Sequence, residues 1–573
     1  MLLPVIALFI FICNSNAANL LGNGDFENGN LSPWDCQDCS AKIIQGSNHY
    51  HGQHSVEVSG RHHNWAGIAQ TFSVTGGHSY KCSIYIKLLN LGSGKSYAHV
   101  NLDIDYQQNG HHYLGLCNDK FHEANLNFEE IGGDFHIPSG VNQARVYVQV
   151  EDPSVNYIVD YASCEQIPHD AQWRSHANAR IDSIRKGPLT IKLDAASNLD
   201  TSGLSVQIKQ TKSKFAFGTA FNAPYVTDSS HTAYQQFIYD NFEWGVPENA
   251  LKWKLMEWTK GHINYNKGMD AVKKLRAHGI KVRGHNMFWD DPNHIPEWLK
   301  GMSSSQALQL MHKRVNDMVS HSKGTLEHWD VNNENLHAHP FEDLTHDPHI
   351  TQKMFDWIHA LEPNNKLFLN EYNVITSSYS TTPFKSLGKR YKDSGVPISG
   401  MGIQGHFGSS NINLDVLKYR LDKVAEAGLP IWITELTFKD PNENNKATAL
   451  DNVMTMFFSH PAIDGVLLWG FWENAIYDKQ LSLATGSNVT PNAAGRKWIE
   501  LFHQRFRTNE SHNFHGSNHR VDTRVFYGEH QLILKQNGKT IHTENVSFTQ
   551  ARTATIHLQG TGQNIHVSNV AFG

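Results

Sequence analysis

Two glutamates in the sequence stand where a charged side chain is costly. Glu334, in WDVNNEN, and Glu435, in WITEL, are embedded in apolar sequence of the kind that forms β-strands. Burial there raises the pKa of a carboxyl group unless a partner compensates, so such residues are usually kept for chemistry rather than for folding. Two carboxyl groups on opposite sides of a cleft can cleave a glycosidic bond. A salt bridge is the alternative interpretation of either residue taken singly.

The elements that would position both glutamates alternate between strand-like and helix-like sequence. Helical stretches such as YNKGMDAVKKLRAHG separate short apolar segments that we expect to be strands: 215–222, 241–249, 281–289, 328–336, 366–373, 398–406, 430–436 and 465–472. Eight such units over roughly 260 residues predict a (β/α)8 TIM barrel, with a doubly wound sheet as the alternative. Most segments end in polar or aromatic residues, which favours the barrel because its active sites form at the C-terminal strand ends.

Several motifs of this region occur together, among them ENALKW, RGHNMFW, WDVNNENL, LFLNEYN, GIQGHF, WITEL and LLWGFW. Over about residues 178–570 they resemble glycoside hydrolase family 10, chiefly endo-β-1,4-xylanases, and the details FWDDP and WGFWE are closer to its plant-and-animal branch. The resemblance implies a retaining endo-β-1,4-glycosidase acting on plant cell-wall polysaccharide, xylan first. In it, Glu334 is the general acid/base and Glu435 the nucleophile.

The same resemblance implies supporting residues. His406 would hydrogen-bond Glu435 and keep it charged, and Asn333 would hold the sugar 2-hydroxyl. Gln404 and Asn373 would orient the same groups, with a structural role equally open for both. The implied substrate-binding residues are Glu248, Asn249, Lys252, His285, Trp289, Tyr372, Gln404, Trp469 and Trp472. Tryptophans that match no binding position are expected to pack: Trp244, Trp253 and Trp258.

Four positions depart from the commoner family pattern. Asp290 stands in place of a histidine, and Pro292 in place of a sugar-binding glutamine. Glu371 and Thr437 each stand in place of an aspartate. None of these changes removes a catalytic group, but they alter the glycone side, so cleavage of β-1,4-glucan remains open beside xylan.

Residues 18–165 contain short alternating segments, such as HSVEVSG and AHVNLDIDY, between Gly and Asn turns. This pattern predicts an antiparallel β-sandwich. Its opening, NLLGNGDFENGNLSPW, resembles the carbohydrate-binding modules that often precede plant-cell-wall hydrolases. On that resemblance Trp65 and Tyr106 would stack on sugar rings, because an aromatic face packs against the apolar face of a pyranose. A core role is equally open for both residues.

The remaining segments lie on either side of the predicted barrel, which takes up residues 215–505. Residues 166–186 are typical of a helical connector. Strand-like sequence occurs at 187–214 and returns only at 506–573. We therefore expect one small discontinuous β-domain that is built from both segments.

The N-terminus predicts secretion. Residues 1–17 combine a short apolar run with the ending Ser15-Asn16-Ala17, as in a signal peptide cleaved after Ala17; a signal anchor is the alternative. Secretion permits disulfides, and the spacing of Cys36 and Cys39 favours a local disulfide over a zinc knuckle or a redox motif. An odd number of cysteines then remains, so at least one thiol is unpaired: Cys36, Cys39, Cys82, Cys117 and Cys164. Glycosylation sequons occur at Asn30, Asn488, Asn509 and Asn545.

Composition limits the partners. The 573 residues are enough for about three to five folding units. Lys and Arg total 49 against 55 for Asp and Glu, so the chain lacks the basic excess of nucleic-acid-binding proteins. We expect a secreted, extracellular monomer that binds polysaccharide, with no nucleic acid or membrane as partner and no metal or other cofactor. A non-catalytic, lectin-like protein on the same fold is the alternative function.

Overall fold

The computed structural model describes residues 18–93, 97–124, 127–514 and 519–573, in two compact units that divide between His169 and Asp170. The expected signal peptide, residues 1–17, lies outside the described residues. Within the described ranges, no helix combines the length and the apolar character that crossing a membrane requires.

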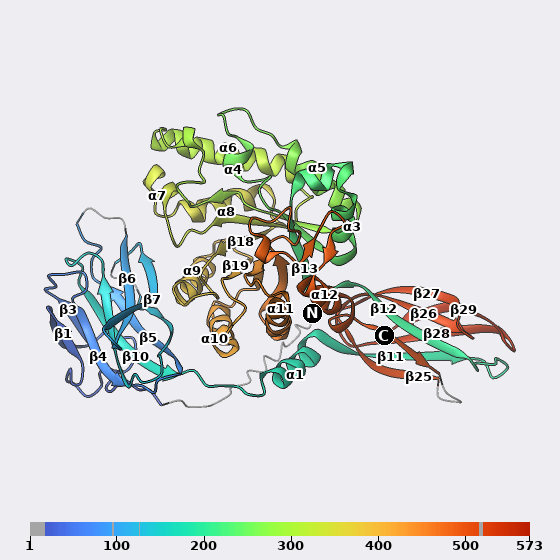
Figure 1. Ribbon diagram of the computed structural model, residues 1–573, viewed down its shortest axis with the longest axis horizontal. Helices are drawn as coiled ribbons and strands as arrows, with labels where there is room; N and C mark the ends of the chain where they lie inside the picture. The colour runs from blue at the N-terminus through green and yellow to red at the C-terminus, as the bar shows by residue number, and fades with distance from the viewer. Residues whose placement is uncertain (1–17, 94–96, 125–126, 515–518) are drawn as a thin grey trace. The chain divides into compact units, whose positions relative to one another are not determined.

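The first unit is a sandwich of two antiparallel sheets, with strand orders β1-β4-β9-β6-β7 and β2-β3-β10-β5-β8 (Figure 1). Successive side chains of a strand point to opposite faces, and in β6 this places Val100, Leu102 and Ile104 in the core. The strands are β1 (Asp35–Gln37), β2 (Ser40–Gln45), β3 (His54–Ser59), β4 (Gly67–Ser73), β5 (Ser79–Leu88), β6 (Ala98–Gln107), β7 (His111–Phe121), β8 (Glu129–His136), β9 (Gln143–Val150) and β10 (Tyr157–Gln166).

Two disulfides close this unit. Cys36 and Cys39 are bonded, as expected, at the end of β1. Cys82 and Cys164 are bonded across the neighbouring strands β5 and β10, where they stand directly opposite each other. Cys117 is the unpaired cysteine of the described residues; it is buried, and burial raises the pKa of its thiol.

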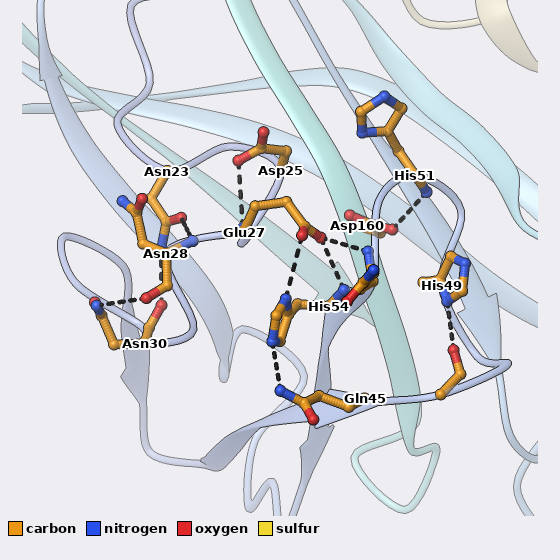
Figure 2. A network of polar contacts seen from close by, with 12 residues as sticks. Asn23, Asp25, Glu27, Asn28, Asn30, Gln45, His49, His51, His54 and Asp160 are labelled. Atoms are coloured by element: carbon orange, nitrogen blue, oxygen red, sulfur yellow. Dashed lines mark hydrogen bonds and ion pairs between the residues drawn. The ribbon is translucent and has the colours of Figure 1, made fainter.

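Carboxylates fix the loops at one end of the sandwich, as Figure 2 shows. The Glu27 carboxylate accepts backbone hydrogen bonds from Gln53 at 2.7 Å and from His54 at 2.8 Å, and these bonds lower its pKa to about 2. Asp160 accepts from the backbone N–H groups of Tyr50, at 2.7 Å, and His51, at 2.9 Å. The carboxylates thereby satisfy backbone N–H groups of the loop before β3 and of His54, the first residue of β3.

The second unit begins with helix α1 (Trp173–Arg185) and a β-domain of two four-stranded sheets, ordered β25-β11-β28-β29 and β24-β12-β26-β27. Strand β11 pairs with β25 and β28, and β12 with β24 and β26. Strands before and after the barrel therefore share one domain. They are β11 (Lys186–Ala195), β12 (Leu204–Ser213), β24 (Asn509–Asn513), β25 (Arg520–Phe526), β26 (Gly528–Gln536), β27 (Lys539–Phe548), β28 (Arg552–Thr561) and β29 (Asn564–Phe572).

Between these segments, parallel strands close into the predicted eight-stranded barrel, with β21 pairing back onto β13. A two-residue strand, β16, adds to the edge of β17. The barrel strands are β13 (Ala216–Phe221), β14 (Trp244–Pro247), β15 (Lys281–Gly284), β17 (His328–Asn333), β18 (Lys366–Glu371), β19 (Gly400–Phe407), β20 (Ile431–Phe438) and β21 (Ile463–Leu468). The expected strand 281–289 is divided into β15 and β16 (Phe288–Trp289), because the chain between them turns to place His285 against Asp330.

Helices surround these strands (Figure 1). The long helix α6 begins with a capping box, in which the Ser303 and Gln306 side chains each accept from the other's backbone N–H. The helices are α2 (Ala223–Thr227), α3 (Thr232–Asn241), α4 (Trp253–Met256), α5 (Asn266–Ala277), α6 (Ser304–Ser322), α7 (Pro340–Thr345), α8 (Ile350–Leu361), α9 (Thr381–Asp393), α10 (Leu414–Ala425), α11 (Glu443–Ser459) and α12 (Ala493–Glu500). Shorter elements are η1 (Ser229–His231), η2 (Glu297–Leu299), η3 (Lys479–Leu481), η4 (Leu501–Arg505), β22 (Ala484–Thr485) and β23 (Thr490–Pro491).

Aromatic side chains fill the barrel interior and its surroundings. The Trp244 ring packs on Trp432, with 4.8 Å between the ring centroids, and Trp253 is buried among the core residues. The expectation that Trp258 packs in the same way is wrong, because its side chain is 71% exposed. It lies just past the short helix α4, where the chain has left the core.

Candidate active site

Glu334 directly follows β17 at the mouth of the barrel. Its φ of 62° lies in the left-handed region, which is rare for a residue with a Cβ and recurs at functional sites. Its backbone N–H donates to the Asn370 carbonyl of β18 at 2.8 Å. Trp289 Nε1 donates to Oε2 at 2.7 Å, and Gln404 Nε2 donates to Oε1 at 2.8 Å. Both carboxyl oxygens are thus held in place.

The surroundings of Glu334 favour its protonated form. Burial raises the pKa of this carboxyl group, and the negative charges of Glu371 and Glu435 act in the same direction. The hydrogen bonds from Gln404 and Trp289 oppose the shift but do not reverse it. Glu334 can therefore carry a proton at a pH where an exposed glutamate is ionised.

Glu435 lies within β20, opposite Gln404 of β19. Asn370 Nδ2 donates to its Oε1 at 2.9 Å, and His406 Nε2 lies 3.1 Å from its Oε2. Burial raises the pKa of Glu435, but the His406 hydrogen bond and the positive charges of His285 and Lys252 outweigh burial and hold it below its usual range. Glu435 is therefore kept as the carboxylate.

Asn370, which the sequence analysis missed, joins the two catalytic candidates. It lies opposite Asn333 in the β17–β18 ladder. Its Oδ1 accepts from Thr434, so its Nδ2 is directed to Asn333 Oδ1, at 2.8 Å, and to Glu435. A signal was present in LFLNEYN, where the polar residues Asn370 and Glu371 follow an apolar run and are buried with it.

The residues predicted for the glycone side converge on Lys252. Its Nζ lies 3.1 Å from Asn249 Oδ1, 4.5 Å from the Trp289 ring centroid and 5.8 Å from that of Trp469. Burial lowers the pKa of Lys252, while the nearby negative charges of Glu435, Glu248 and Glu334 oppose the shift. Burial likewise raises the pKa of Glu248. A buried ammonium group thus lies among these carboxylates.

His285 and the two tryptophans after β21 continue this wall. His285 Nδ1 lies 2.9 Å from Asp330 Oδ2, and its ring lies 5.2 Å from the Trp469 ring. Trp469 also lies 6.4 Å from His406. Trp472 has other contacts: its Nε1 donates to the Gly486 carbonyl at 2.8 Å, and its ring contacts Tyr225.

On the other side of Glu334 lies a cleft of about 280 Å³, lined by Glu334, Tyr372, Asn373, Thr376, Gln404 and His406. The Tyr372 ring stacks on His337 with 3.8 Å between centroids. His337 is in turn paired with Glu371, Nε2 to Oε1, at 3.2 Å. Tyr372, Gln404 and Asn373 therefore share one open space beside the acid candidate.

The positions that depart from the family pattern have separate surroundings. Asp290 is buried, accepts from Asn332 Nδ2 at 3.3 Å and so braces the end of β17. Pro292 is exposed in a turn. Thr437 Oγ1 lies 3.0 Å from His406 Nδ1, so a neutral hydroxyl contacts His406 on the side away from Glu435. Glu371 accepts from the backbone of Leu336 at 3.0 Å.

In the sandwich, the two residues proposed to bind sugar have different surroundings. Trp65 is 42% exposed and stacks on His63. Tyr106 is only 8% exposed, so the expectation that it stacks on sugar is wrong: it follows Ile104 on the inward face of β6. Tyr113, on the neighbouring strand β7, is 66% exposed and better placed for a ligand.

A closed parallel barrel with two oppositely tuned carboxyl groups at its mouth places the protein among the barrel-fold glycoside hydrolases. The chain belongs to glycosyl hydrolase family 10, whose model matches residues 207–495, and a carbohydrate binding domain model matches residues 18–155.

Individual proteins are similar to parts of this chain. The anti-sigma-I factor RsgI6 of Acetivibrio thermocellus is 34% identical over 368 residues, covering 64% of this chain and 47% of that protein. Endo-1,4-beta-xylanase 1 of Arabidopsis thaliana is 30% identical over 457 residues, covering 78% of this chain and 46% of that protein. Xylanase 10B of Thermotoga petrophila, solved with xylobiose, has a TM-score of 0.47 and 22% identity, covering 51% and 95% of the two chains. The chain thus spans about half the length of the curated relatives it matches.

Proposed function

We propose that the protein is a retaining endo-β-1,4-xylanase in which Glu435 is the nucleophile and Glu334 the general acid/base. The observation that carries the proposal is the opposite pKa shift of two carboxyl groups at one barrel mouth, raised for Glu334 and lowered for Glu435. Double displacement needs this division between an acid and an anion. The family match and the xylanases among the relatives support xylan as the substrate.

The reaction follows from these two states. The Glu435 carboxylate attacks the anomeric carbon and forms a glycosyl-enzyme ester, while Glu334 gives its proton to the departing glycosidic oxygen. Glu334, now ionised, then takes a proton from water, whose oxygen attacks the same carbon and releases Glu435. Both carboxyl groups return to their starting states, and the sugar retains its β configuration.

Neighbouring amides and imidazole support both steps. Asn370 and His406 hold the two oxygens of Glu435, so that the attacking oxygen is oriented before substrate arrives. Asn333, which is fixed by Asn370, would bind the 2-hydroxyl beside the anomeric carbon.

Soluble xylan tests the activity. We expect new reducing ends and, by proton NMR of the first product, the β-anomer. An α-anomer as the first product would overturn the retaining mechanism. Retention of the polymer without any new reducing ends would instead support the lectin-like alternative.

For specificity, we propose that β-1,4-glucan is a slower second substrate. Asp290 is buried, and Pro292 has no polar side-chain group, so neither position supplies a hydrogen bond or a polar wall to the glycone. Discrimination between substrates that differ by one hydroxymethyl group is worth only ~1–3 kcal/mol, or about 10- to 200-fold in rate. A rate on carboxymethyl-cellulose more than about four orders of magnitude below the rate on xylan would exclude this idea.

For the N-terminal unit, we propose polysaccharide binding through the exposed rings of Trp65 and Tyr113. Binding would raise the effective concentration of the barrel at insoluble substrate. Trp65→Ala and Tyr113→Ala should therefore reduce activity on insoluble xylan more than on soluble xylan. Equal activity of the double variant and the parent on insoluble xylan would contradict the proposal.

We also propose that the protein is secreted. Two disulfides within the first unit fit an oxidising compartment. The sequon residues Asn30, Asn488, Asn509 and Asn545 are exposed. Expression with the native N-terminus should place glycosylated protein that begins at Ala18 in the medium; N-terminal sequencing and glycosidase treatment check this.

A further inference from the structure

Trp289 is one of two side chains that orient the carboxyl group of Glu334. Its indole N–H donates to Glu334 Oε2 at 2.7 Å. Its backbone belongs to β16, a strand of two residues at the edge of β17, and the flanking residues Met287 and Asp290 donate backbone hydrogen bonds to β17. Side-chain contacts position the indole relative to this backbone.

His294 supplies one of these contacts. Its imidazole stacks on the Trp289 ring with 3.7 Å between centroids and 12° between planes. The Lys252 ammonium group lies 4.5 Å from the centroid of the same ring. Because the imidazole covers one face at van der Waals distance, the ammonium group lies over the other, and the indole is held from both sides.

The turn that carries His294 is itself braced. Asp291 Oδ2 lies 2.7 Å from His294 Nδ1, and since a carboxylate only accepts, Nδ1 is the donor. Asp291 Oδ1 accepts from the backbone N–H of Asn293 at 2.8 Å. Pro292 lies within this turn, and its ring restricts the backbone there by fixing φ of the proline. A contact chain therefore runs from Asp291 through His294 and Trp289 to Glu334.

We propose that His294 is a positioning residue for the acid/base carboxyl group, acting through the indole of Trp289. The inference rests on the proposed role of Glu334 as the proton donor. His294 touches neither the carboxyl group nor the reacting atoms; its ring limits the movement of Trp289, and the Trp289 N–H holds the carboxyl oxygen. Loss of the imidazole should then impair proton delivery rather than nucleophilic attack.

Leaving-group dependence tests this role in the full-length protein. With phenyl β-xylobioside, whose leaving group needs a proton, His294→Ala should lower kcat/KM by about 5- to 20-fold. With 2,4-dinitrophenyl β-xylobioside, which needs little protonation, the change should stay within about twofold. His294→Phe keeps a flat ring against the indole and should restore most of the loss with the phenyl substrate.

His278→Ala is the matched control. His278 stacks on Tyr239, also with 3.7 Å between centroids, but it follows α5 at the end of the barrel away from the strand C-termini. This variant should show no dependence on the leaving group, and thermal melting checks the folding of each protein.

Two results would overturn the inference. One is equal loss of activity with both substrates in His294→Ala; the other is a His294→Phe variant as slow as His294→Ala with the phenyl substrate. If Glu334→Ala itself shows no greater loss with phenyl than with dinitrophenyl leaving groups, the acid/base assignment fails instead. The two failures are therefore distinguishable.

Discussion

The same side chain occurs just after β17 and within β20, in two electrostatic surroundings. Glu334 and Glu435 each accept two side-chain hydrogen bonds from the described residues. Glu435 is the more deeply buried, so burial alone would give it the higher pKa. The shifts run the other way, because a hydrogen bond from His406 and nearby positive groups lower the pKa of Glu435, whereas the negative charges of Glu371 and Glu435 add to the raised pKa of Glu334. The hydrogen bond from His406 and the sign of the neighbouring charges, rather than the depth of burial, therefore separate the acid from the anion.

Removal of the anion should have the largest effect. Glu435→Ala leaves no group to form the glycosyl-enzyme, so turnover should fall by up to about 10⁶-fold with every substrate, whatever the leaving group. Steady-state rates on xylan and on aryl xylobiosides check this. If Glu435→Ala keeps its activity on dinitrophenyl xylobioside, another group is the nucleophile.

Removal of the acid should depend on the substrate. Glu334→Ala should lose about 10²- to 10⁴-fold on xylan, which needs a proton donor. With dinitrophenyl xylobioside the first step should survive and the ester should accumulate for want of a base. Azide should then speed turnover and give a β-configured glycosyl azide, detectable by NMR. If Glu334→Ala and Glu435→Ala are equally inactive with this substrate, even with azide, the assignment of separate acid/base and nucleophile roles is wrong.

Removal of positive charge near Glu435 tests the cause of its low pKa. The acidic limb of kcat/KM reports ionisation of the nucleophile, because only the carboxylate attacks. His406→Phe removes both the hydrogen bond and the charge that lower this pKa. The pKa should rise, so the acidic limb should move to higher pH. A pH profile with an unmoved acidic limb would show that other groups keep Glu435 ionised.

The smallest expected effect concerns a neutral donor to Glu334. The alkaline limb reports loss of the proton from the acid. Gln404 donates to the charged form and so lowers the pKa. Gln404→Ala should raise this pKa and move the alkaline limb to higher pH, by less than His406→Phe moves the acidic limb. If the alkaline limb moves to lower pH instead, a group other than Glu334 is responsible for that limb.

The positions of both glutamates could be predicted from the sequence because strands of a parallel barrel are buried on both faces. In such a strand nearly every residue is apolar, so a polar residue at its C-terminal end, as in WITEL, is conspicuous. The barrel is confirmed, and so is the sandwich, which was predicted from the alternation of its strands. The partners of each carboxyl group were harder: Asn370 contacts Asn333 and Glu435 only because β18 lies in register beside β17, and register between distant segments is not visible in one strand's sequence.

Tyr106 shows a different kind of error. The alternation of β6 places Leu102, Ile104 and therefore Tyr106 on the inward face, and this parity was present in the sequence. The aromatic side chain alone suggested a sugar-binding role. Tyr113, which no pattern singled out, is exposed because it lies on the outward face of β7, near its turn with β6.

The order of synthesis matters for this molecule, since strands β11 and β12 leave the ribosome before the barrel and β24 to β29 leave after it. Meanwhile β11 and β12 present unpaired backbone N–H and C=O groups, which are templates for pairing with other chains. The barrel, in contrast, can close on its own strands. A chain that stops after α12 would therefore carry an intact cleft and still tend to aggregate.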